Sequence, residues 1–412
     1  MLARSTIGVI VLLVLAARAV ASAPARTAPL TLTEAVQLAL QMNPSIRAKQ
    51  RERDATRAGE TTAALRPNPT ALYTAEQLGS SNVSQQYTVA LSQTIETGGK
   101  RSRRIESARA ATRVSELELA DVRRQVTAQV KKAFTDVLTA EATVRLASDN
   151  LRNVDELERL NLLRADKGEI AELELLRVQT QRFAFERDLA DAQQAVRAAK
   201  IALRQAVGPE ALAREFDVAG DLVFRDVPLD RERLVQRGLE SRADVRATEA
   251  GRDKARADVE LARANAWWDF APLVQYQRIG SDNTFGVGVS VPLRVFDRNQ
   301  GEIERTRAEV ERADHLRDGA VSQARSEVET ALASVLTERE KVRRLGEVYL
   351  PRAERVRATV EFAYRRGGLS VLDLLDAQRT YRETALEYTR ALGNYWNAVY
   401  QLEAAVGGAL EP

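Results

Sequence analysis

Two segments of the sequence resemble each other across a constant offset of 199 residues, the distance from Gly168 to Gly367. Asp166–Gln179 reads DKGEIAELELLRVQ, and Arg365–Gln378 reads RRGGLSVLDLLDAQ. Three leucines and the final glutamine align along with the glycine. In both segments the glycine interrupts a long helical pattern that resumes directly afterwards, as expected of a residue that readily ends a helix. The sequence therefore predicts a helical hairpin tip that is made twice.

The same offset relates other parts of the chain. Leu30–Ala48 aligns with Leu229–Ala247 with apolar residues at matching positions, and Gly208 aligns with Gly407. A period this long indicates two tandem copies of one supersecondary unit. We therefore divide the chain into a leader over residues 1–23, a first repeat over 24–208, a connection over 209–228, a second repeat over 229–407 and a tail over 408–412.

Residues 1–23 have the pattern of a secretory signal peptide. Arg4 precedes the apolar run Ile7–Ala17, and small residues follow up to Ala23; such a run is too short to span a bilayer. Without Arg4 and Arg18, 59 of the 61 basic residues remain against 58 acidic ones. A nearly neutral chain has no electrostatic drive toward nucleic acid, so we expect no nucleic-acid partner.

The composition favours long helices packed on one another. The chain is 44% hydrophobic and 29% charged but only 5% aromatic, which is typical of extended helical proteins. It has no cysteine, which excludes disulfides, thiolate metal sites and lipid attachment through an N-terminal cysteine. Beyond the leader no run of about 18 apolar residues could cross a membrane as a helix. An exported chain of this kind is periplasmic, secreted or in an outer membrane as a β-barrel.

Each repeat contains a pair of segments with the alternating pattern of β-strands. Phe285, Val287 and Val289 alternate with small or polar residues, and turn-forming residues separate the members of each pair. Aromatic residues near the strand starts, such as Trp267 and Tyr73, are typical of a membrane interface. A length of about 8–10 residues suits a tilted membrane-spanning strand. The strands are predicted at about 70–78, 87–95, 273–279 and 285–293.

Four strands in one chain leave exposed edges, and in lipid every backbone donor and acceptor needs a partner. Closing the sheet therefore requires other subunits in a ring. Two chains would supply eight strands and three would supply twelve, and the residues alone leave both open. Small Gly, Ser and Thr residues opposite the apolar face indicate a polar lumen.

The longest helical pattern runs from Lys100 to Lys167 without a proline. At ~1.5 Å per residue this length would reach roughly 100 Å. The second repeat has the same pattern over Glu302–Arg366, where we expect an interruption at Leu350–Pro351 because proline removes a helical hydrogen bond. The glycine turns therefore lie far from the strands.

The order helix, strand hairpin, long helix, glycine turn and helix, made twice, resembles the TolC-like outer-membrane efflux proteins over the whole mature chain. Ser92–Arg101 (SQTIETGGKR) and Ser290–Ile303 (SVPLRVFDRNQGEI) are most similar to the heavy-metal branch of that family, the cobalt–zinc–cadmium type. The resemblance implies a mainly α fold with a small β part. Three chains would share a twelve-stranded outer-membrane β-barrel, four strands per chain, above an α-helical periplasmic tunnel.

The resemblance also implies partners and site residues. The partners are two further copies in a homotrimer, a periplasmic adaptor (membrane fusion) protein, an inner-membrane efflux pump of the RND type and outer-membrane lipid. The residues that would dock the adaptor lie at the two tips: Gly168, Glu169, Ile170, Gly367, Gly368 and Leu369.

Four more positions match the family's channel entrance. Asp373 and Asp376 correspond to the aspartates that ring the constriction, and Tyr364 and Glu174 correspond to residues that hold the closed state. Leu369 departs from the family prototype, which has an arginine there. The closed-state contacts of this chain are therefore expected to differ from those of the prototype.

The spacing of the two aspartates is a second, independent reason to expect that they act together at the channel entrance. Residues three apart share a helix face, so Asp373 and Asp376 point the same way. In a trimer they would form a cluster of six carboxylates, which attracts cations. The alternative is that they are two solvated acids on a helix surface among the 58 acidic residues of the chain.

Nothing in the sequence predicts an enzyme, a cofactor or a bound metal. His315 is the single histidine and lies in a charged helical stretch, whereas a metal site needs several convergent ligands. Gly98, Gly99 and Lys100 lack the spacing of a phosphate-binding loop and lie where a strand passes into a helix.

The predicted function is the outer-membrane channel of a tripartite efflux system, a passive exit duct with heavy-metal cations as the cargo that the resemblance implies. A duct for drugs or secreted polypeptides stays open as an alternative. A periplasmic coiled-coil scaffold or adaptor without a channel is the alternative from another class. The alternating strands favour the duct, because a scaffold has no need of two amphipathic hairpins of membrane length.

Overall fold

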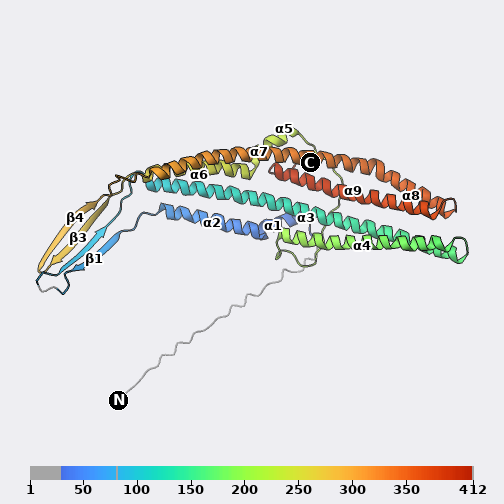
Figure 1. The fold of residues 1–412 in the computed structure, drawn as a ribbon, viewed down its shortest axis with the longest axis horizontal. Coiled ribbons are helices and arrows are strands. Elements are labelled where there is room, and N and C mark those ends of the chain that lie inside the picture. Colours follow the sequence, from blue (N-terminus) through green and yellow to red (C-terminus); the bar gives the residue numbers. More distant parts are fainter. Residues whose placement is uncertain (1–28, 80–81, 411–412) are drawn as a thin grey trace, which may run out of the picture.

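The computed structural model describes residues 29–79 and 82–410, so the predicted signal peptide lies outside the described residues. The molecule is elongated, with a sheet at one end and two helical hairpin tips at the other (Figure 1). Among the described residues, no helix combines the length and the hydropathy that a membrane span needs.

The elements follow one order twice. The first copy consists of α1 (Leu32–Met42), α2 (Pro44–Ala64), β1 (Thr70–Glu76), β2 (Gln86–Ser92), α3 (Lys100–Asp166) and α4 (Glu172–Val207). The second consists of α5 (Arg231–Ser241), α6 (Ala243–Asn265), β3 (Ala271–Ile279), β4 (Asp282–Ser290), α7 (Gln300–Arg344), the π-helical turn η1 (Leu345–Tyr349), α8 (Leu350–Arg365) and α9 (Val371–Ala405). This order confirms the predicted fold class, mainly α with a small β part and two tandem repeats.

Local sequence explains where the first helices begin. Thr31 and Glu34 form a capping box at the start of α1, in which each side chain accepts from the other residue's backbone. The Asn43 side chain caps α2, whose first residue is Pro44, a position at which proline costs no hydrogen bond. These caps turn the chain between two helices that share the core of the first copy.

The break predicted at Leu350–Pro351 begins five residues earlier. Leu345–Tyr349 forms a π-helical turn, and Pro351 lies in the first turn of α8. Gly346 faces the ring of Tyr388, and a Cβ there would lie 2.9 Å from that ring. The wider turn lies where a second helix approaches closely, and it contains Glu347, to whose carbonyl Pro351 has no N–H to donate.

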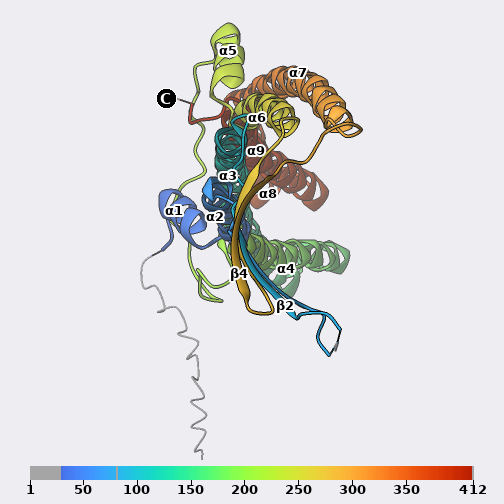
Figure 2. The ribbon, with the colours of Figure 1, turned by 90° about the vertical axis from the view of Figure 1, so that its left-hand side faces the viewer.

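The four strands form one antiparallel sheet in the order β1-β2-β3-β4. Viewed from this end, they leave the helices together as one curved ribbon (Figure 2). Residues paired across neighbouring strands point to the same face. One row of pairs joins Tyr73, Val89, Tyr276 and Phe285, and the next row joins Thr74, Thr88, Gln277 and Thr284. The sheet therefore has an apolar, aromatic face and a polar face without charge in these rows.

The strand bounds differ from those predicted by periodicity. β1 ends at Glu76 rather than 78, β2 covers 86–92 rather than 87–95, β3 begins at Ala271 rather than 273, and β4 covers 282–290 rather than 285–293. The shift in β4 has a clear cause, because Asp282 pairs with Ile279 and only Gly280 and Ser281 make the turn. Polar residues at a strand start were wrongly assigned to the loop.

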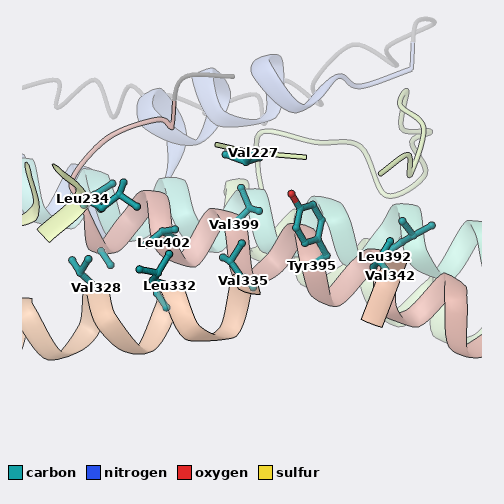
Figure 3. Close-up of a cluster of buried hydrophobic side chains, with 14 of the residues drawn as sticks. Val227, Leu234, Val328, Leu332, Val335, Val342, Leu392, Tyr395, Val399 and Leu402 are labelled. Atoms are coloured by element: carbon teal, nitrogen blue, oxygen red, sulfur yellow. The ribbon is translucent and has the colours of Figure 1, made fainter. Parts of the chain in front are cut away.

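Each copy has its own hydrophobic core. Leu30, Ile46, Phe134 and Leu203 are buried in the first. Tyr395 is buried in the second, where its hydroxyl points toward the connecting segment near Val227 (Figure 3).

The connection over 209–228 is bonded to both copies. The Tyr395 hydroxyl donates to the carbonyl of Arg225 at 2.7 Å, and the Trp396 ring nitrogen donates to that of Val223 at 2.9 Å. The backbone N–H of Ala219 donates to Leu30 in the first copy. The connection therefore ties the two cores together.

Candidate channel gate and membrane sheet

Both hairpin tips turn through a left-handed glycine. Gly168 has φ +73° and Gly367 has φ +76°. The residue after each glycine donates its N–H to a carbonyl five positions earlier, Glu169 to Arg164 at 2.8 Å and Gly368 to Ala363 at 2.9 Å. This is the Schellman arrangement, which needs a residue tolerant of positive φ. The glycines singled out in the sequence are therefore the residues that make the turns.

The two tips of one chain are joined by a buried tyrosine. Tyr364 on α8 is only 3% exposed, and its hydroxyl donates a hydrogen bond to the side-chain oxygen of Asn161 on α3. Asn161 is fully buried and donates its amide to the carbonyl of Leu157 at 3.1 Å. Val371 and Leu374 of α9 are buried in the same small cluster. We call this contact the in-chain junction.

Arg164 is the second polar residue of the in-chain junction. It donates to the carbonyl of Arg365 at 2.6 Å and to that of Tyr364 at 3.4 Å. Its guanidinium also lies 5.3 Å from the centre of the Tyr364 ring. The last carbonyls of a helix lack partners within the helix and carry partial negative charge. Arg164 from α3 therefore caps the end of α8.

The sequence predicts Tyr364 and Glu174 as closed-state contacts, and it does not point to Asn161 or Arg164. Burial raises the pKa of Tyr364, and Glu174 adds a smaller effect in the same direction. The hydrogen bond of the hydroxyl goes to Asn161. Their spacing puts Asn161 and Arg164 on one helix face just before the turn at Gly168, but nothing in the sequence distinguishes that face from the other faces of this charged helix.

Asp373 and Asp376 have different local partners. Asp373 and Ser370 cap α9 reciprocally: the Ser370 hydroxyl donates to the carboxylate at 2.7 Å, and the Asp373 N–H donates to that hydroxyl at 3.3 Å. The Ser370 hydroxyl bond lowers the pKa of Asp373. Asp376 pairs with Arg379 at 2.7 Å. Both aspartates line one groove of about 550 Å³ on the second hairpin.

The joint between sheet and helices contains an ion pair between the buried Lys100 and the half-buried Asp269. The Lys100 ammonium, at the start of α3, lies 2.6 Å from Asp269, which also accepts from the N–H of Thr97 at 2.9 Å. Beside it Gly98 has φ +63°, and a Cβ there would lie 2.7 Å from Trp267. The glycine pair that superficially resembled a phosphate loop therefore serves close packing at this joint.

The structure places His315 on the exposed surface of α7. Within residues 29–79 and 82–410, no three or more His, Asp or Glu side chains come together in a way that could hold a metal ion.

Comparison with known proteins assigns the chain to a family. The family model described as "Outer membrane efflux protein" matches residues 35–209 and 234–408, which is most of both copies. The cobalt-zinc-cadmium resistance protein CzcC of Cupriavidus metallidurans is 28% identical over 387 residues, 92% of this chain and 90% of that protein.

Solved outer-membrane channels share the fold. OprN matches with a TM-score of 0.75 and 22% identity over 92% of this chain and 91% of its own. CusC matches with a TM-score of 0.76 and 17% identity, covering 92% of each chain. MtrE of Neisseria gonorrhoeae matches with a TM-score of 0.76 and 20% identity over 92% of this chain and 89% of its own. By the family match over both repeats, the chain belongs to the outer membrane efflux protein family.

Proposed function

We propose that this outer-membrane efflux protein is the passive exit duct of a tripartite system, fed by an inner-membrane RND pump through a periplasmic adaptor. The sheet is the observation that carries the proposal. Its apolar row faces one side and its uncharged polar row faces the other, as a strand needs when one face meets lipid and the other meets water. The long helices would extend the same passage into the periplasm.

A trimer completes the duct. β1 and β4 each have one neighbour in the described sheet, so both outer edges are free to pair. Pairing β4 of one chain with β1 of the next chain would join the four strands of each of three chains into a closed ring of twelve. No strand edge would then be exposed to lipid.

Heavy-metal cations are the proposed cargo. The support is the relative CzcC, which is named for cobalt, zinc and cadmium resistance and matches over nearly its whole length. A duct has no need of a resident metal site, because conduction requires that the ion leave as readily as it enters. Cargo choice would then rest mainly with the pump.

The helical tips form the proposed gate and docking site. The in-chain junction of Tyr364, Asn161 and Arg164 would hold the tips together in the closed state, with Glu174 beside it. Asp373 and Asp376 would line the constriction. The tip residues would contact the adaptor, namely Gly168, Glu169, Ile170, Gly367, Gly368 and Leu369.

Four measurements test the proposed function. The protein should fractionate with the outer membrane, migrate as a heat-modifiable trimer and form pores in planar bilayers. A deletion strain should become sensitive to cobalt, zinc or cadmium and recover with the intact gene, while its sensitivity to hydrophobic drugs stays unchanged. A soluble protein would rule out the duct. Drug sensitivity without metal sensitivity would leave the duct standing and overturn the cargo.

A further inference from the structure

The chain passes from a strand into a long helix twice, and only the first of these two loops has a strand partner within the chain. Residues 93–99 lead from β2 to α3, and the N–H of Ile95 donates to the carbonyl of Phe270, in the segment before β3, at 2.8 Å. Residues 291–299 lead from β4 to α7, and among the described residues they pair with no other strand. We call the first contact the in-chain joint and its unfilled counterpart the free joint.

The repeat shows which positions of the two joints correspond. Gly98 and Arg298 each directly precede the left-handed residue at the start of α3 or α7. Trp267 and Arg66 each lie two residues beyond the end of the preceding helix, α6 or α2. Gly98 and Trp267 are in contact, because a Cβ on the glycine would lie 2.7 Å from the tryptophan side chain. A second chain that pairs its β1 with β4 in the same way would bring its Arg66 against Arg298.

The in-chain joint balances its charges, whereas the free joint does not. Lys100 pairs with Asp269 at 2.6 Å, and Arg104 pairs with Glu96 at 2.6 Å. Neither acid is kept at the corresponding positions of the free joint, which are Asn68 and Phe296.

Four arginines border the free joint without forming an ion pair in the part of the chain that the structure describes. They are Arg66, Arg101, Arg294 and Arg298. Arg101 donates its Nε–H to the carbonyl of Ala64 at 2.7 Å. Asp297 is the one acid among residues 291–299, and it accepts from the backbone N–H of Asn299 at 2.8 Å. The free joint therefore carries an excess of positive charge, although the mature chain is nearly neutral.

The free joint is also apolar, and it adjoins the apolar face of the sheet. Leu293 is 83% exposed and Phe296 is 92% exposed. The bridge between Ile95 and Phe270 continues the apolar row, because it lies an even number of residues beyond a pair of that row in both strands. The apolar face thus reaches the level of these loops, where the membrane part passes into the periplasmic helices (Figure 1). Basic residues among exposed apolar ones suit a surface that meets acidic headgroups and acyl chains.

We propose that each seam between chains binds an acidic phospholipid of the inner leaflet of the outer membrane, with its phosphate between Arg298 of one chain and Arg66 of the next. The inference rests on the proposed trimeric duct. Two guanidinium groups in contact repel each other. An anion between them removes the repulsion, since arginine binds phosphate through a planar fork of donors. Leu293 and Phe296 would lie against the acyl chains, which a free phosphate ion lacks.

A cysteine pair tests whether the two arginines meet. Arg66→Cys with Arg298→Cys should form a disulfide between chains when outer membranes are oxidised, and a reductant should release the linked chains on a denaturing gel. The sequence has no cysteine of its own, so each single variant gives the background. Arg66→Cys with Arg263→Cys is the matched control. Arg263 is an exposed arginine at the end of α6, beside the in-chain joint, and this pair should leave the chains unlinked.

Retained lipid tests the ligand. Trimers purified in detergent are incubated with equal amounts of phosphatidylglycerol and phosphatidylcholine, and bound lipid is counted by native mass spectrometry. We expect wild type to prefer phosphatidylglycerol by about tenfold or more, and Arg66→Gln with Arg298→Gln to bind both lipids equally. Arg66→Lys with Arg298→Lys keeps the charge and should keep most of the preference. Both arginines are exposed, so these variants should keep the heat-modifiable trimer.

Two controls separate this site from charge in general and from phosphate alone. Arg103→Gln with Arg263→Gln removes two arginines near the same loops that pair with acids, at 2.9 Å and 2.7 Å, and should keep the wild-type preference. Inorganic phosphate in excess should not displace the phospholipid, because it cannot cover the apolar surface of Phe296.

Other outcomes overturn the proposal in distinguishable ways. If the glutamine variant prefers phosphatidylglycerol as much as wild type does, the two arginines do not hold the headgroup. If inorganic phosphate displaces the lipid, the site binds a free anion instead. If the cysteine pair never links two chains, the packing of the in-chain joint is not repeated at the seam. A trimeric pore without lipid preference overturns the lipid site alone, whereas a wild-type protein that forms neither trimer nor pore overturns the proposed duct.

Discussion

The hydroxyl of Tyr364 donates a hydrogen bond to Asn161 across 203 residues of sequence and across the gap between two helical hairpins. Both partners are buried, and Arg164 closes the contact from the same helix as Asn161. The tip of the molecule is thus held by a small cluster of buried apolar and polar side chains rather than by a large core.

Removing the Tyr364 hydroxyl should loosen the tips without unfolding the helices. Tyr364→Phe leaves the Asn161 oxygen buried without its donor, which costs about 1–3 kcal/mol at the junction. We expect a higher open probability in planar bilayers and an unchanged melting temperature of the trimer. Tyr381→Phe, whose ring stacks on Arg357 within the second hairpin, is the control and should behave as wild type.

The junction should weaken at high pH. Burial raises the pKa of Tyr364 above its ordinary value of 10.0, so the folded junction favours the neutral phenol. This contribution to stability is fully present below pH ~10 and is lost as pH rises through the raised pKa. Opening in bilayers should increase over that range for wild type and stay flat for Tyr364→Phe. An equal response in both proteins would assign the effect to another group.

Arg164→Ala should fray the end of α8. The change removes the charge-assisted hydrogen bond to the Arg365 carbonyl, worth about 1.5–3 kcal/mol. Amide exchange should accelerate over 365–370 and stay unchanged in the sheet. Arg164→Lys should rescue it only in part, because an ammonium cannot reach two carbonyls as a planar fork does. Arg177→Ala changes an exposed arginine of the first hairpin and is the control. If it accelerates amide exchange over 365–370 as much as Arg164→Ala does, Arg164 is not a specific cap of α8.

Neutralising the constriction aspartates should lower cation preference. Asp376→Asn removes a carboxylate at the proposed mouth and should shift the reversal potential toward zero without loss of stability. Asp373→Asn should act alike but also weaken the cap of α9, at a cost of about 0.5–1 kcal/mol. Asp314→Asn, on α7 away from the tips, is the control. A variant that carries both Asp373→Asn and Asp376→Asn should lose the most cation preference. If its cation selectivity equals that of wild type, neither aspartate lines the constriction.

Charged replacements at the tip glycines should block adaptor docking. A Cβ at Gly168 or Gly367 meets nothing within 4 Å, so the added side chain points into solvent, and the cost is backbone strain of about 1–2 kcal/mol. Gly367→Asp should abolish cross-linking to the adaptor while trimers persist. Gly59→Asp, at an exposed site on α2, is the control. Loss of the trimer would instead show that these glycines are needed for folding, and it would contradict a role limited to adaptor docking.

The repeat and the tip turns could be predicted because they depend on local chemistry. Gly168 and Gly367 mark their turns through a backbone conformation that few other residues tolerate. The alternation of apolar and polar residues predicts the strands, but it places the start of β4 too late in the sequence. The reason is that the polar residues Asp282 and Asn283 already pair with β3 there. A residue's strand or turn preference cannot show where its partner strand ends.

The partners of the in-chain junction could not be predicted from the sequence. Asn161 and Arg164 look like ordinary polar residues of a charged helix, and their partners are 203 and 201 residues away. Nothing local distinguishes them from the exposed Arg177. Only the packing of the two copies brings them to Tyr364, so the contact appears with the tertiary fold.

The order of the strands has a consequence for how the protein is made. Thr88 in β2 lies opposite Gln277 in β3, 189 residues later in the chain. The first strand pair must therefore wait, with its apolar row uncovered, until Ala271–Ile279 follows in the second repeat. An isolated two-stranded hairpin is only marginally stable in water. Until β3 follows, the first strand pair lacks the neighbour that completes the sheet, so the membrane part cannot assemble from the first repeat alone.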